Sequence, residues 1–102
     1  SEFKVQGLEI DYSVVCWDAD LRRVNNCWEY YSFKGTKWNK RNKKEQKRYL
    51  LNAYRVLLTR ARQGMIIFVP TGDDFEIDAT RDKEYYNGIY DYLTIKCGIK
   101  KL

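Results

Sequence analysis

The stretch AYRVLLTRARQGMIIFVP, Ala53–Pro70, decides the fold that this chain is expected to adopt. Its first half sets arginines among apolar residues, and its second half holds the continuous apolar run MIIFV. Such a run, rich in β-branched residues, is typical of a strand covered on both faces in a parallel sheet. A buried guanidinium is costly unless it meets an anion. The stretch therefore raises the question of which anion Arg55, Arg60 and Arg62 meet.

The segment before this strand carries an apolar stripe at helical spacing, formed by Leu50, Tyr54, Leu57, Leu58 and Ala61. The stripe predicts a helix over about 44–62. Gly64 stands where a glycine commonly ends a helix. Arg60 is accordingly expected near the end of this helix, at the surface of the isolated chain and without an anion of its own.

The rest of the chain supplies further elements. Ile10–Trp17 predicts a strand, the segment DADLRRVNN after it a loop, and CWEYYSFKGTKW a hairpin around KGT. Residues 82–96 have the spacing of a last helix, with Gly98 at its end. The expected fold class is α/β, with a parallel βαβ unit, an inserted hairpin and a C-terminal helix. Because a parallel sheet needs more strands, we expect the chain to be part of a larger domain.

Positive charge is concentrated in one block. The net charge is −3 over residues 1–33, +10 over 34–62 and −2 over 63–102. Such a block favours a phosphate or polyanion partner, although a solvated loop and helix face would have the same composition. Candidate nucleic-acid contacts lie in a basic hairpin and helix lead-in at about 26–48, namely Lys37, Trp38, Lys40, Arg41, Lys43 and Lys44.

Several classes of protein are disfavoured. The chain has three cysteines, widely spaced, and no histidine, so a zinc site is not expected. The carboxylates of residues 73–78 are expected to be solvated rather than to bind metal. No apolar run reaches about 18 residues, so we expect no membrane span. Reduced thiols in a cytoplasmic protein are the simplest interpretation.

Two motifs, about fifty residues apart, carry a resemblance. QGLE (6–9) and VLLTRAR (56–62), each before a strand, resemble the last two motifs of UvrD-like superfamily-one helicases. VQGLEIDY, DADLR and the YYNGIYDYLTIKCGIKKL ending make the whole chain similar to an uncharacterised family related to the Schlafen helicase domain. The resemblance implies that residues 1–102 are the C-terminal portion of the second RecA-like domain, a partial P-loop NTPase fold.

The resemblance also implies roles for individual residues. Arg60 would be the arginine finger that stabilises charge on the γ-phosphate of ATP, an effect of about 10³–10⁵ in rate. Glu9 would accept a hydrogen bond from the ribose, and Gly7 would allow close approach of the backbone. Gln6 would lie between the ATP and nucleic-acid sites, and Arg62 is a further nucleotide-binding candidate. Without the resemblance, Arg60 and Arg62 would be interpreted as cations at a helix C-terminus.

The chain departs from the helicase pattern in three ways. Phe3 replaces a common histidine, and Arg55 replaces a tyrosine. The sequence also contains no GxxxxGK[ST] phosphate loop. ATP and Mg²⁺ are therefore expected to bind only in a full-length parent, with an upstream phosphate-loop domain, and this segment alone is expected to have no ATPase activity.

Two alternatives stay open. One is a non-catalytic nucleic-acid-binding or protein-interaction module that uses the basic segment 34–48. The other is a degenerate helicase domain retained for protein contacts alone.

Overall fold

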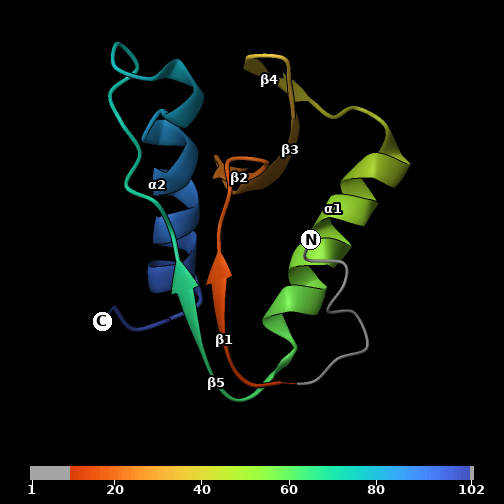
Figure 1. Cartoon of the computed structure of the whole chain (residues 1–102), viewed down its shortest axis with the longest axis vertical. Coiled ribbons are helices and arrows are strands. Elements are labelled where there is room, and N and C mark those ends of the chain that lie inside the picture. Colours follow the sequence, from red (N-terminus) through yellow and green to blue (C-terminus); the bar gives the residue numbers. More distant parts are fainter. Residues whose placement is uncertain (1–9, 102) are drawn as a thin grey trace.

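The computed structural model describes residues 10–101 and shows a mixed α/β arrangement (Figure 1). Its elements, in chain order, are strands β1 (Ile10–Cys16), β2 (Leu21–Val24), β3 (Cys27–Lys34) and β4 (Lys37–Lys40), helix α1 (Lys44–Leu58), strand β5 (Ala61–Phe68), the 3₁₀ turn η2 (Ala79–Arg81), helix α2 (Glu84–Asp91) and the π-helical turn η3 (Tyr92–Lys96). The predicted α/β class is confirmed.

β1 and β5 pair in parallel, and α1 lies between them in the chain. Figure 1 shows the two strands side by side, with α1 and α2 apart from each other. The predicted βαβ unit is therefore confirmed. The inserted hairpin is also confirmed, because β3 and β4 pair antiparallel across a two-residue turn. Gly35 opens that turn with φ of +63°, a backbone conformation that glycine adopts at little cost.

The segment after β1 is more ordered than its polar sequence predicted. DADLRRVNN was expected to be a loop, but Leu21–Val24 forms β2, which pairs antiparallel with β3. Asn25 and Asn26 make the turn, both with positive φ (51° and 64°). Leu21 is only 1 % exposed, so tertiary burial of this side chain outweighs the polar character of its neighbours.

The long helix ends earlier than its apolar stripe predicted. α1 stops at Leu58, and the backbone N–H groups of Thr59 and Arg60 bond to carbonyls three residues back. The Thr59 hydroxyl also donates to the Val56 carbonyl. Ala61 then pairs with Ile10, which takes the chain into β5. The prediction of a helix through residue 62 is wrong, because the residues from Ala61 on form β5 and pair with β1.

β5 also corrects two predictions. Gly64 does not end a helix, because it lies within β5 and pairs with Tyr12, whose ring covers it. The strand is not covered on both faces, because Ile66 and Phe68 are 46 % and 56 % exposed. Within residues 10–101, the parallel sheet contains only β1 and β5, so the described chain brings too few elements to cover the outer face.

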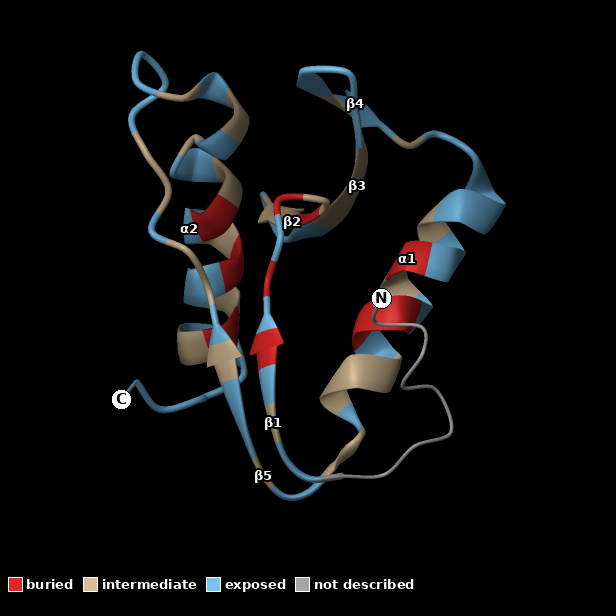
Figure 2. Cartoon of the chain, in the orientation of Figure 1, coloured by how far each residue is buried: buried red, intermediate tan, exposed pale blue. Residues whose placement is uncertain are grey.

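The core lies where β1, β2, α1 and the C-terminal helix meet (Figure 2). Its buried cluster contains Trp17, Leu21, Leu50, Tyr54, Ile89 and Leu93. The predicted C-terminal helix is confirmed as α2 with η3, followed by Gly98 at φ +71°. Gly88 lets α2 approach β2, because a Cβ atom there would lie 1.8 Å from the Arg23 carbonyl oxygen.

Candidate functional site

The strand that follows QGLE and the strand that begins within VLLTRAR start at the same edge of the parallel sheet. Ile10, the first residue of β1, is the Cα partner of Ala61, the first residue of β5. QGLE (6–9) immediately precedes Ile10, whereas Ala61 lies within VLLTRAR (56–62). Gln6, Gly7 and Glu9 lie outside the described residues, as does Phe3. The described part of the chain therefore contains the second motif, including Arg60.

Arg60 lies in the connector between α1 and β5, not on the helix. It is half-buried, whereas a fully exposed side chain was expected. Its Nε atom is buried and has no hydrogen-bond partner within residues 10–101. A buried guanidinium nitrogen without an acceptor is costly. Within residues 10–101, no acceptor meets the Arg60 Nε atom.

The backbone beside Arg60 is irregular. The pairing shifts register between Ile10 and Tyr12, so that Arg62 and Gln63 lie opposite Asp11 alone. A β-bulge of this kind redirects side chains and is frequent next to functional sites. Arg62 is exposed on the bulge and has an interaction of its own. Arg55 is exposed on the last turn of α1.

Tyr54 holds α1 against the loop after β1. Its hydroxyl donates to Asp20 Oδ1 at 2.6 Å and accepts from the Asp18 N–H at 3.1 Å. Its ring packs on Trp17 with centroids 4.5 Å apart. Burial raises the pKa of Asp20, against the opposing effect of the Tyr54 hydrogen bond. Burial likewise raises the pKa of Tyr54, with Asp20 adding to the effect. This contact fixes the helix that leads into the connector with Arg60.

The basic segment 34–48 spans β4 and the start of α1. Lys37, Lys40, Lys43 and Lys44 are exposed there. Lys43 is the N-cap of α1 and makes no side-chain capping hydrogen bond, and Lys44 is the first helical residue. Cations at a helix N-terminus oppose the helix dipole, which favours an anion at that position. The start of α1 is therefore a place where a phosphate would relieve an unfavourable charge arrangement.

Two of the six candidate nucleic-acid residues are already engaged inside the fold. The Trp38 indole N–H donates to the Thr80 carbonyl at 2.9 Å, and its ring packs edge-on against Phe33. Arg41 Nε donates to the Tyr31 carbonyl at 3.1 Å. Both side chains are half-buried. All four lysines of the set are exposed, and one of them, Lys40, is paired with Glu29 at 3.8 Å.

Two arginines of β2 were missed by sequence reasoning. Arg22 is 6 % exposed, and its guanidinium lies between the rings of Tyr31 and Tyr85, 3.7 Å and 3.6 Å from their centroids. Burial lowers the pKa of Arg22. Arg23 lies over Trp28 and Tyr92, 4.9 Å and 4.4 Å from their centroids. The high aromatic content of the chain was the sequence feature that could have indicated these arginine–aromatic contacts.

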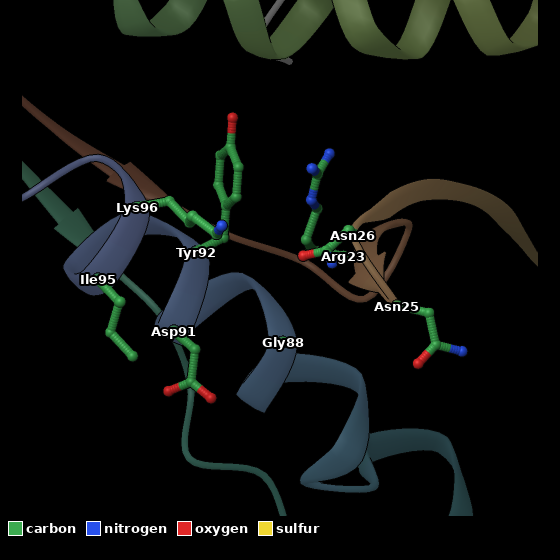
Figure 3. A pocket seen from close by; sticks show the side chains of 8 residues that line it. All are labelled: Arg23, Asn25, Asn26, Gly88, Asp91, Tyr92, Ile95 and Lys96. Carbon is green, nitrogen blue, oxygen red and sulfur yellow. The ribbon is translucent and has the colours of Figure 1, made fainter.

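A small cavity of about 230 Å³ lies between the β2–β3 turn and the C-terminal helix (Figure 3). The turn contributes Asn25 and Asn26, and the helix contributes residues from Gly88 to Lys96. None of these residues was a candidate from the sequence. The dipeptide Asn25-Asn26, in the segment expected to be a loop, was the sequence feature that could have indicated the tight turn beside this cavity.

The structure defines a mixed α/β protein in which a parallel strand pair carries Arg60 at its edge. A family model described as Schlafen group 3, DNA/RNA helicase domain, matches residues 1–71, and the chain belongs to this family. No curated protein sequence and no solved structure matches the chain significantly. Within the described residues, no helix is long and apolar enough to cross a membrane.

Proposed function

We propose that this chain contributes the arginine finger of an ATP site in a helicase-type NTPase. The observation that supports the proposal is the pairing of Ile10, the residue after QGLE, with Ala61, a residue of VLLTRAR. Arg60 precedes Ala61 directly, and its Nε lacks a partner among the described residues. A γ-phosphate bound by another domain would supply the missing acceptor.

The finer assignments belong to the same proposal. The domain is the second RecA-like domain of a superfamily-one, UvrD-like enzyme, and an upstream phosphate-loop domain holds Mg²⁺-ATP. Glu9 accepts from the ribose, while Gln6 and Gly7 contact the nucleotide and nucleic-acid region. Arg62, on the bulge, contributes a second positive charge. Arginine suits these positions because its planar guanidinium stays charged and binds phosphate oxygens in pairs.

The test is ATP turnover in the natural protein that carries this segment. Arg60→Ala lowers turnover by about 10³-fold or more, in line with the effect of arginine fingers elsewhere. Arg81→Ala is the matched control, because Arg81 is exposed in η2, far along the chain from both motifs. Normal turnover in Arg60→Ala would remove the finger assignment.

A second candidate function is nucleic-acid binding through the basic segment 34–48. The exposed lysines around the uncapped start of α1 favour it. Titration of the chain with single-stranded DNA and RNA at two salt concentrations tests it. Binding that weakens steeply with salt supports phosphate contacts by this segment. Salt-independent binding, or none, argues against it.

A further inference from the structure

Three uncommon backbone features border the cavity of Figure 3. Asn25 and Asn26 both have positive φ, although glycine is preferred at the second position of such a turn. Tyr92–Lys96 forms a π-helical turn, a geometry often found at functional sites. Gly88 permits a contact with β2 that any Cβ atom would prevent. All three features lie beside the same cavity.

The walls of the cavity are held in place. Gly88 sets the separation between α2 and β2 through its approach to the Arg23 carbonyl. Arg23 is packed against the rings of Trp28 and Tyr92, and its Nε is buried without a partner in the described chain. Trp28 and Tyr92 also pack edge to face, with centroids 5.2 Å apart. The cavity is thus largely preorganised, which lowers the cost of binding.

The polar groups around the cavity suit a nucleobase better than a phosphate. Asn25 and Asn26 each offer an amide donor and an acceptor, and Lys96 adds a donor. Asp91 offers acceptors alone, and its charge opposes a phosphate. Figure 3 shows the Asn25 amide and the Asp91 carboxylate extending toward the same side of the view, with Gly88 between them. Ile95 adds exposed apolar surface for a flat heterocycle, while the Tyr92 ring extends toward α1 and packs on Trp28 and Arg23 (Figure 3).

We propose that this cavity binds one unstacked base of a single-stranded nucleic acid, and that Asp91 selects a base with an exocyclic amino group. Asp91 accepts hydrogen bonds from that amino group, as carboxylates do from cytosine N4. The amides of Asn25 and Asn26 pair with the remaining edge of the base. The proposal deepens the nucleic-acid-binding candidate and is independent of Arg60. It also differs from backbone binding by the basic segment, because it depends on the base.

The test compares three labelled single strands of about eight nucleotides, within the usual site size of single-strand binding folds. One is oligo-dC, one is oligo-dT, and one is an abasic strand with the same number of phosphates. Fluorescence anisotropy with the 102-residue chain at neutral pH is expected to show about tenfold tighter binding of oligo-dC than of either other strand. Equal binding of all three strands, or no binding of any, would overturn the proposal.

Two variants locate the preference. Asn26→Gly keeps the positive φ that the turn requires but removes the amide, and Asp91→Asn removes the carboxylate while nearly keeping its shape. Each is expected to reduce the preference for oligo-dC to about twofold or less, with an unchanged circular dichroism spectrum. Glu76→Gln, which removes a carboxylate at an exposed position outside both the cavity and residues 34–48, is the control that keeps the preference. A preference for oligo-dC that survives both cavity variants would overturn the proposal.

The experiment separates base binding in the cavity from phosphate binding by the basic segment 34–48. If the abasic strand shows no salt-dependent binding, phosphate contacts by residues 34–48 are ruled out. The difference in affinity between oligo-dC and oligo-dT reports on the cavity alone.

Discussion

Ile10 and Ala61 are Cα partners in the first register position of the parallel sheet. The pairing brings together two strands about fifty residues apart, the first of which follows QGLE and the second of which begins within VLLTRAR. It also ends α1 before residue 60 and moves Arg60 from a helix into a connector. The position of Arg60 therefore depends on two things, the strand pairing and the anchoring of α1.

The anchoring of α1 is tested by Tyr54→Phe. The substitution removes the donor to Asp20 and leaves a largely buried carboxylate with one hydrogen bond fewer. The expected loss in free energy of unfolding is about 1–3 kcal/mol. Urea denaturation followed by circular dichroism measures it. Tyr12→Phe, at a 73 % exposed position, is the control and should change stability little. Equal stability of the two variants would show that the Tyr54 hydroxyl does not anchor the helix.

The raised pKa of Asp20 predicts how the stability of the fold depends on pH. Because burial raises its pKa in the folded state above the ordinary 3.8, folding favours the protonated carboxyl group. Its stabilising contribution is complete below pH 3.8 and is lost as the pH rises through the folded-state pKa. Relative to Asp20→Asn, the natural chain should lose stability from acidic to neutral pH.

Urea denaturation of both proteins across this range measures the difference. Asp74 and Asp78 have pKa values lowered by Lys83 and Thr80, which gives the opposite slope. Both proteins share these groups, so their contribution cancels. If the natural chain instead gained stability relative to Asp20→Asn as the pH rose, a raised pKa of Asp20 in the folded state would be contradicted.

Gly88→Ala sets two effects against each other. Alanine at an exposed helix position gains about 1 kcal/mol over glycine. Here the new Cβ atom would lie 1.8 Å from the Arg23 carbonyl oxygen, and overpacking of this kind costs about 1–3 kcal/mol or more. We expect net destabilisation and a lower melting temperature in circular dichroism. Gly35→Asn, with no atom near its Cβ and a positive φ that asparagine tolerates, should melt almost unchanged.

Arg22→Lys tests the stacked guanidinium. Lysine keeps the charge but loses the planar group that lies between the Tyr31 and Tyr85 rings, and also the Nε–H donated to the Ala19 carbonyl. Desolvated cation–π contacts are worth about 2 kcal/mol. The variant should therefore unfold at lower urea concentration than Arg81→Lys, a change at an exposed position. Identical unfolding midpoints would mean that the stacking does not stabilise the fold.

The periodicity of the sequence was enough to predict the β1–α1–β5 unit and the C-terminal helix. It did not predict β2, because burial of Leu21 and the two-asparagine turn depend on contacts distant in sequence. The end of α1 was also missed, because an apolar stripe continues through Ala61 while pairing with Ile10 takes that residue into a strand. Arg60 was identified by motif resemblance, whereas the cavity beside Gly88 arises from backbone geometry alone.

The most direct measurement of the central claim uses a transition-state mimic in the natural protein that carries this segment. An arginine finger contacts charge that develops in the transition state, so it should strengthen binding of ADP with aluminium fluoride far more than binding of ADP. Arg60→Ala is expected to bind ADP normally and to lose most of the additional affinity for ADP–aluminium fluoride. Equal affinity of the natural protein and Arg60→Ala for ADP–aluminium fluoride would contradict the role proposed for Arg60.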